Sequence, residues 1–243
     1  MKMTRFAPSS ARFRWRAFAA VTLTLLLASP WPAQADATHP VAQAGTTHVD
    51  FKSDNPSADA RQIADWVAVS HDNQGAEFVI VDKKAATVYV FDAAAKLTGS
   101  APVLVGAAKG DDSVPGIGDR PIADVRPEER TTPAGRFVAE LGRNAHGEDV
   151  VWVDYDAAVS MHRVRANNPK ERRLERLATP TADDNRISYG CINVPAAFYD
   201  AQIQPIFAKR AAVVYVLPDV KSLQQVFGPT SVVVTAAKLS TRR

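Results

Sequence analysis

The chain has 243 residues, with 29 Lys and Arg, 26 Asp and Glu, and one cysteine, so no internal disulfide can form. Five of the basic residues and none of the acidic ones fall within residues 1–35, which leaves 24 basic and 26 acidic residues, a net charge of −2, in the remainder. A basic face for nucleic acid is therefore not expected, and the remaining length is sufficient for one well-packed domain.

Residues 1–35 have the composition of a secretory signal peptide. Basic residues precede the apolar run AFAAVTLTLLLA, and small residues suited to cleavage follow at Ala33 and Ala35. That run is shorter than a bilayer-spanning helix, which needs about 20 residues. We expect export to a periplasm with cleavage after Ala35, or after Ala37 as second choice. If the signal stayed uncleaved, the chain would be membrane-anchored.

Residues 36–75 are expected to form an N-terminal leader and a helix, since Ser57 can cap a helical pattern over residues 58–70. Residues 76–218 then carry many short β-rich runs with turn signals between them, and residues 219–243 read as a C-terminal tail. This pattern predicts a mainly β, largely antiparallel domain with a few added helices. The expected strands are 78–82, 87–92, 102–108, 135–141, 149–164 with a break, and 212–218.

Two irregular stretches interrupt the strands. Residues 110–135 are rich in glycine, proline and charge, and a loop of this length is typical of a functional segment or of disorder. Residues 165–185 contain a short amphipathic helix, with Asn168 as its cap and Pro169 at its first position. A solvated helix face is the favoured interpretation of the arginines on that helix, and a wall of the site is the alternative: Arg172, Arg173 and Arg176.

The single cysteine lies in RISYGCINVP, residues 186–195. A lone thiol in an exported chain is either buried or used. Gly190 allows a tight turn in which the backbone N–H groups of Tyr189, Gly190 and Cys191 could stabilise an oxyanion. Helical spacing over residues 194–207 would also place Cys191 near a helix N-terminus, where the dipole favours a thiolate.

A cysteine nucleophile needs a base, and His162 is the best candidate among five histidines. It ends a strand-like run shortly before the cysteine segment, where a sheet could hold its ring rigidly. The other four lie in the leader, after the first helix, or in a turn-like stretch: His39, His48, His71 and His146.

Two motifs with a histidine between them resemble the L,D-transpeptidase (YkuD) catalytic domain of bacterial cell-wall enzymes. The first motif is TTPAGRF, residues 131–137, and the second is SYGCIN, residues 188–193. The resemblance covers about residues 76–218 and implies a β-sandwich or barrel. It also implies that Cys191 is the nucleophile and His162 the general base, with these residues forming the oxyanion hole or supporting the geometry: Ser188, Tyr189, Gly190 and Asn193. A turn hydroxyl for Ser188 and a helix cap for Asn193 are the simpler alternatives.

Three features depart from the family pattern. Tyr189 stands where a second histidine is usual, and Arg163 stands where glycine is common. The segment 163–187 is also longer than usual, and the additional length corresponds to the arginine-rich helix. These changes affect the identity of the substrate and the acceptor more than that of the nucleophile.

The resemblance implies a peptidoglycan L,D-transpeptidase that forms a cysteine thioester with a tetrapeptide stem and then makes a 3–3 cross-link or attaches another amine. Arg163 and Arg186 are the expected contacts for substrate carboxylates. We expect a monomer with no cofactor and no metal, because one cysteine cannot form a zinc cage and no HExxH is present. The alternatives are an L,D-carboxypeptidase or endopeptidase that uses water, and a non-catalytic envelope-binding protein.

Overall fold

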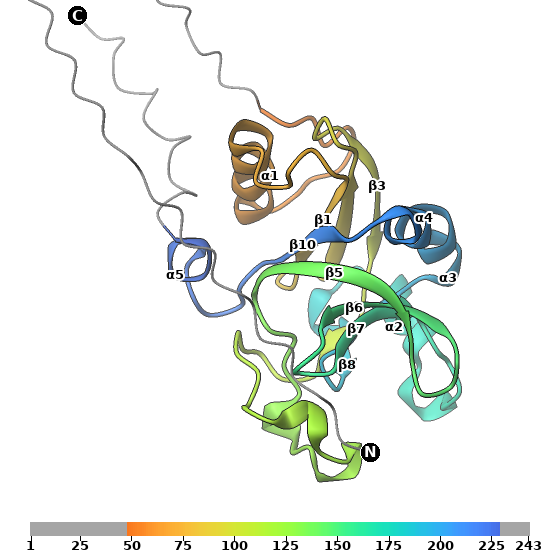
Figure 1. The fold of residues 1–243 in the computed structure, drawn as a ribbon. Coiled ribbons are helices and arrows are strands. Elements are labelled where there is room, and N and C mark those ends of the chain that lie inside the picture. The colour runs from red at the N-terminus through yellow and green to blue at the C-terminus, as the bar shows by residue number, and fades with distance from the viewer. Residues whose placement is uncertain (1–47, 229–243) are drawn as a thin grey trace, which may run out of the picture. The chain divides into compact units, whose positions relative to one another are not determined.

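A computed structural model of the chain describes residues 48–228 (Figure 1). The expected signal peptide, the leader residues 36–47 and the tail residues 229–243 lie outside the described residues. Between residues 48 and 228, no helix is long and apolar enough to cross a membrane.

The described part of the chain is mainly β, as expected. Eight strands form one sheet in the order β3-β2-β1-β10-β5-β6-β7-β9, and β4 pairs with β8 separately. Three pairs, β1 with β10, β7 with β9 and β4 with β8, are parallel, and the others are antiparallel. The strands are β1 (Phe78–Asp82), β2 (Thr87–Phe91), β3 (Leu97–Pro102), β4 (Val105–Gly106), β5 (Gly135–Arg143), β6 (Asp149–Asp154), β7 (Val159–Arg163), β8 (Arg186–Ser188), β9 (Ile192–Val194) and β10 (Ala212–Val216).

The main sheet nearly closes on itself. Its last strand, β9, bonds back to the segment that follows β3, because the N–H of Leu104 donates to the Asn193 carbonyl at 2.9 Å and the N–H of Asn193 donates to the Leu104 carbonyl at 2.8 Å. The two ends of the strand order are thereby joined, and the strand that follows the cysteine is held on both edges.

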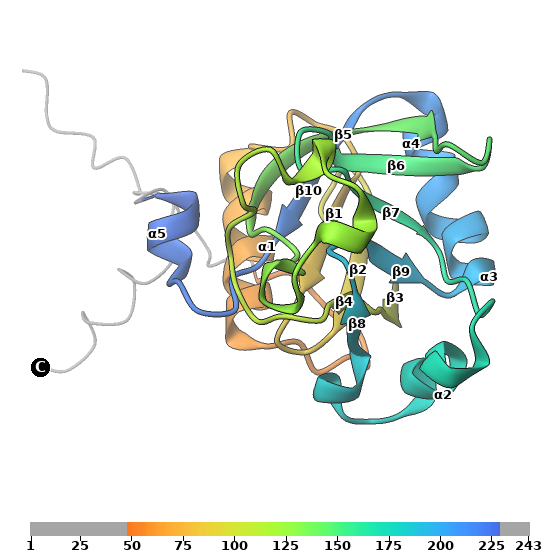
Figure 2. The same ribbon diagram turned by 90° about the horizontal axis from the view of Figure 1, so that it is seen from below.

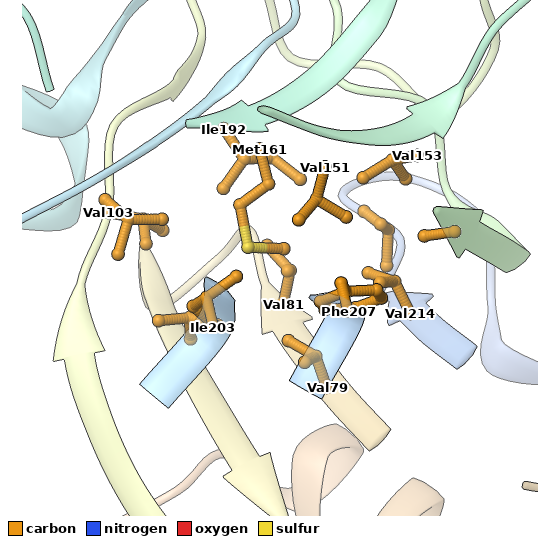
Figure 3. Packing of buried hydrophobic residues seen from close by; sticks show 14 of the residues in the cluster. Val79, Val81, Val103, Val151, Val153, Met161, Ile192, Ile203, Phe207 and Val214 are labelled. Carbon is orange, nitrogen blue, oxygen red and sulfur yellow. The ribbon is translucent and has the colours of Figure 1, made fainter. Parts of the chain in front are cut away.

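The inner face of the sheet encloses the main core. Figure 3 shows Met161 and Ile192 on one side of this core, and Val81, Ile203 and Phe207 across from them. Val79 and Val81 of β1 point into this core, and the residues that alternate with them point to the other face of the sheet. All five side chains of β1 are buried, so the sheet is covered on both faces here.

Helix α1 (Ala58–Ser70) covers the outer face of β1 and β10 (Figure 1). It begins where expected, since the Ser57 hydroxyl accepts the N–H of Ala60 at 3.0 Å. Its buried side chains Ile63 and Val67 belong to a second apolar cluster with Phe78 and Ile80 of β1.

The remaining helices are short. Three 3-10 turns lie in the segment between β4 and β5, residues 107–134, which we call the long loop: Ile117–Asp119, Ile122–Asp124 and Pro127–Glu129. The segment between β7 and β8 contains a 3-10 turn at Pro169–Glu171, helix α2 (Arg173–Ala178) and a 3-10 turn at Ala182–Asn185. Helix α3 (Ala196–Phe198), a π-helical stretch (Tyr199–Ile203) and α4 (Gln204–Lys209) follow β9, and α5 (Leu223–Phe227) follows β10.

Two local expectations were wrong, and one strand was missed. The run 102–108 is not one strand, because β3 ends at Pro102 and β4 holds only two residues. The strand β3 itself, LTGSAP, was missed because it buries only Leu97 and has neither alternation nor β-branched enrichment. Cys191 does not lie at a helix N-terminus either, since strand β9 separates it from α3.

Candidate active site

The pairing of β7 with β9 brings the cysteine and the histidine onto one face of the sheet. Met161 is aligned with Ile192, and both side chains are buried in the inner core. Side chains alternate along a strand, so Ser160 and His162 project from the opposite face of β7. Cys191 directly precedes Ile192, so its side chain projects from that same face, where it lies near Ser160 of β7. Figure 2 shows β9 beside β7.

The thiol of Cys191 lies between two oxygen atoms of the neighbouring chain segment. Its Sγ is 3.7 Å from Ser160 Oγ and 3.7 Å from the Ala158 carbonyl oxygen. The ring of His162 is fixed separately, because its Nδ1 lies 2.7 Å from the Arg163 carbonyl oxygen. That oxygen can only accept, so Nδ1 carries a proton and Nε2 is the atom left to exchange a proton with the thiol.

The two side chains shift each other's pKa. Burial raises the pKa of the Cys191 thiol. The larger, opposite effect comes from its hydrogen bond to His162, the charge of that ring and the contacts with Ser160 together, so the net pKa is below its usual value. Burial lowers the pKa of His162, and the hydrogen bond and charge of Cys191 reverse this, so the net pKa is raised. Both shifts act in the direction of a thiolate beside an imidazolium, which is the reactive form of a cysteine.

The turn before the cysteine is held by a serine hydroxyl. Ser188 Oγ donates to the Cys191 carbonyl oxygen at 2.6 Å and accepts the N–H of Gly190 at 3.1 Å. The simpler role considered for Ser188, a turn hydroxyl, is thus the observed one. Ser188 Oγ also engages the N–H of Gly190, so that group is not free to bind an oxyanion. Of the three candidate donors, the N–H groups of Tyr189 and Cys191 have no acceptor within residues 48–228.

Gly190 occupies a position that another residue could not take. Its φ is +132°, and a Cβ at this position would lie 2.7 Å from the Thr131 carbonyl oxygen. The next residue of the long loop, Thr132, donates its hydroxyl to the Gly190 carbonyl at 2.7 Å and accepts the N–H of Gly106 at 2.9 Å. The TTPAGRF motif therefore contacts the cysteine motif directly.

Asn193 contacts the backbone of Cys191 and does not cap a helix. Its side chain is fully buried, its Nδ2 donates to the Cys191 carbonyl at 3.1 Å, and the cap position of α3 is occupied by Pro195. The Oδ1 of Asn193 accepts from Arg173 Nη1 at 2.6 Å.

Arg173, for which a solvated helix face was the favoured interpretation and a wall of the site the alternative, contacts Asn193 of the cysteine motif. Its side chain is 14% exposed, so it does not belong to a solvated helix face. The available signal was its spacing: Arg173 lies four residues before Leu177, the buried residue of α2, and residues four apart share a helix face. The apolar Leu174, one position after Arg173, is 59% exposed.

The two arginines expected to bind substrate carboxylates already have carboxylate partners. Arg163 pairs with Asp149 and Asp200, at 2.9 and 2.6 Å. Arg186 is only 9% exposed and makes two contacts with Asp219, at 2.6 and 3.1 Å. These carboxylates come from segments distant in the sequence, so sequence proximity to the motif was a poor guide to free charge.

Two cavities adjoin the strand that carries the base. One of about 400 Å³ is lined by His162 and Arg165, among others, and one of about 470 Å³ is lined by Trp152, Tyr155 and Ala158, whose carbonyl contacts the thiol. No group of three or more His, Cys, Asp or Glu side chains in residues 48–228 could hold a metal ion.

Comparisons with known proteins give distant structural likeness only. No protein-family model and no curated protein matches the chain. Among solved structures, LD transpeptidase LdtMt1 in complex with imipenem is 16% identical with a TM-score of 0.34, over 58% of this chain and 59% of that one. The catalytic domain of an E. faecium L,D-transpeptidase is 16% identical with a TM-score of 0.33, over 58% of this chain and 96% of that one. The helical cell shape determining protein Pgp2 from Campylobacter jejuni is 14% identical with a TM-score of 0.38, over 68% of this chain and 59% of that one.

The chain thus spans less than two thirds of the length of LdtMt1 and of Pgp2. Likeness at these identities and TM-scores says nothing about activity, so any functional proposal depends on the site itself.

Proposed function

We propose that the chain is a cysteine acyltransferase of the L,D-transpeptidase type that acts on peptidoglycan stem peptides. The observation that carries the proposal is the juxtaposition of Cys191 and His162 on one sheet face, with the pKa of the thiol lowered and that of the ring raised. The substrate class comes from the resemblance of the two sequence motifs to that family.

The reaction follows from the protonation state of the pair. The Cys191 thiolate attacks a peptide carbonyl carbon, so that a C–S bond forms and the oxygen becomes an oxyanion, for which the N–H groups of Tyr189 and Cys191 are the candidate donors. His162 gives its proton to the departing amine as the C–N bond breaks, which leaves a thioester. An incoming amine then attacks the thioester, His162 takes its proton, and the thiolate leaves with the new amide formed.

The cellular setting is part of the same proposal. Peptidoglycan stems lie outside the cytoplasmic membrane, and the signal-like composition of residues 1–35 supports export, with either a periplasmic product or one anchored by an uncleaved signal. The proposed working unit is a monomer.

The deciding experiment is digestion of muropeptides with the purified chain lacking residues 1–35. New 3–3 dimers, identified by mass spectrometry, are expected with the wild type and not with Cys191→Ala. Tripeptide products without dimers would show that water is the acceptor and that the chain is an L,D-carboxypeptidase. If Cys191 in the folded chain resists both a carbapenem and an alkylating reagent, the enzyme proposal is wrong and a binding role remains.

A further inference from the structure

The ring of Tyr189, one of the two residues that depart from the family pattern, is stacked against an arginine side chain. The guanidinium carbon of Arg130, from the end of the long loop, lies 4.1 Å from the centroid of the Tyr189 ring. Tyr189 is 40% exposed, whereas Ser188 and Gly190 on either side of it are buried. The stacked pair therefore lies at the surface of the turn that leads to Cys191.

The guanidinium of Arg130 has unused hydrogen-bonding capacity. Its Nη2 donates to the Val125 carbonyl at 3.2 Å, and its Nε is buried without an acceptor. No carboxylate within residues 48–228 lies in ion-pair range of it, although Glu129 next to it pairs with both Arg120 and Arg126. A half-buried guanidinium that lacks both a counter-charge and an acceptor at Nε is unusual, because a buried charge is ordinarily paired.

The main chain fixes this cation beside the cysteine turn. The carbonyl of Arg130 accepts the N–H of Ala108 at 3.0 Å. The carbonyl of the next residue, Thr131, packs so closely on Gly190 that no Cβ would fit there. These contacts hold the backbone of Arg130 beside the cysteine turn, and the Val125 carbonyl and the Tyr189 ring hold its guanidinium.

We propose that Arg130, oriented by the ring of Tyr189, binds a carboxylate of the peptide that acylates Cys191. This inference rests on the proposed function and adds to it the residue that recognises the donor. A guanidinium presents a planar fork of donors that matches a carboxylate, and stacking on an aromatic face leaves the edge of the fork available. Arg163 and Arg186 cannot serve this purpose without breaking their own ion pairs.

The first test compares tetrapeptide donors with the purified chain lacking residues 1–35. One donor has all carboxylates free, a second is amidated at its C-terminus, and a third is amidated on its side chains. The wild type should prefer the free acid, and Arg130→Gln should reduce kcat/KM for that donor by about 10-fold or more, the size expected for a lost charge-assisted hydrogen bond. The amidated donor whose reaction is insensitive to Arg130→Gln identifies which carboxylate is bound.

Two further variants separate recognition from folding. Arg130→Lys keeps the charge and most of the packing, so it should retain part of the preference for the free acid. Arg172→Gln removes an exposed arginine whose side chain pairs with Glu175, and it should leave the preference unchanged. If wild type and Arg130→Gln show the same ratio of rates for acid and amide donors, the inference is wrong even though the chain is a transpeptidase.

A second readout needs no turnover. Cys191 can be alkylated with N-iodoacetyl-β-alanine, which carries a carboxylate, and with its primary amide, which does not. Arg130 should raise the rate ratio of acid to amide, and Arg130→Gln and Tyr189→Leu should each lower it by several-fold, whereas Arg172→Gln should not. An unchanged ratio in Arg130→Gln overturns the inference, and the absence of any acyl transfer with peptide donors instead overturns the proposed function.

Discussion

Arg173 donates to the buried Oδ1 of Asn193 at 2.6 Å, and Asn193 in turn donates to the carbonyl of Cys191 at 3.1 Å. The helix inserted between β7 and β8 is thereby connected to the proposed nucleophile by two hydrogen bonds. The positive charge of Arg173 also acts on His162, where it lowers the pKa against the larger effect of Cys191.

Replacing Arg173 by methionine should therefore impair both stability and reactivity. Asn193 Oδ1 would be left buried without a donor, at a cost of about 1–3 kcal/mol in the free energy of unfolding. The alkylation rate of Cys191 should fall because Asn193 would no longer be held against the Cys191 carbonyl by Arg173. The pKa of His162, followed by NMR, should rise because an opposing positive charge is gone, and this electrostatic effect alone would favour the thiolate.

Arg172→Met is the matched control, since Arg172 is 68% exposed and its side chain pairs with Glu175. It should change neither unfolding nor the His162 titration. An Arg173→Met variant as reactive as wild type, with an unshifted His162, would show that the inserted helix does not support the site.

The pH dependence of Cys191 alkylation should report the thiolate–imidazolium pair. An ordinary thiol, with a pKa of about 8.5, is only about 0.3% ionised at pH 6. Because His162 lowers the pKa of the Cys191 thiol, the wild type should still react with iodoacetamide near that pH. In His162→Gln the midpoint of the rate–pH profile should move upward towards that ordinary value. A profile that does not move on this substitution would remove His162 from the site.

Much of this architecture was predictable from local pattern, and the exceptions have physical causes. Alternating or continuous apolar runs identified β1 and β10, because their side chains fill cores on both faces. The polar edge strand β3 has no such pattern, and its place depends on pairing with β2 alone.

For the site, the motif residues Cys191 and His162 could be named from the sequence, because a nucleophile and a base must both be present. Charge partners could not be named. Arg186 pairs with the carboxylate of Asp219, 33 residues later in the chain, and Arg130 stacks on the ring of Tyr189, 59 residues later. Only the fold brings these pairs together.

Gly190→Ala should destroy the geometry of the turn. An alanine would have to adopt a φ of +132° and place its Cβ 2.7 Å from the Thr131 carbonyl, so the turn and the N–H groups of Tyr189 and Cys191 must shift. We expect the rate of thioester formation with a carbapenem to fall by at least about 100-fold, the loss typical for one oxyanion donor.

Gly147→Ala provides the comparison for Gly190→Ala. Gly147 also has a positive φ, +77°, but nothing lies within 4 Å of the position that a Cβ would occupy, and the residue belongs to the β5–β6 turn. Its substitution should cost about 1 kcal/mol of stability through backbone strain and leave acylation unchanged. Equal effects of the two substitutions would mean that strain alone, and not the turn beside Cys191, explains the loss.

The buried ion pair of Lys83 and Asp111 should determine how the fold responds to acid. Asp111 accepts from Lys83 Nζ at 2.8 Å and from the backbone N–H groups of residues 219–221. Burial raises the pKa of Asp111, but these hydrogen bonds together lower it by more, so that the pKa is about 2. Its folded pKa lies below the unfolded value of about 3.9, so Asp111 stabilises the fold fully above that value and progressively less as the pH falls towards 2.

Urea unfolding midpoints measured from pH 7 to pH 2.5 should show this loss in the wild type. Asp111→Asn should lower the free energy of unfolding at pH 7 by about 3 kcal/mol, because the buried Lys83 would keep only the more distant Asp219, at 3.5 Å, as its counter-charge. The substitution should also reduce the loss of stability between pH 7 and pH 2.5. Asp112→Asn, at a carboxylate that is 73% exposed, should have little effect at either pH. If Asp111→Asn and wild type lose stability in parallel below pH 4, Asp111 is not ionised through this network, and the long loop is held by its backbone contacts alone.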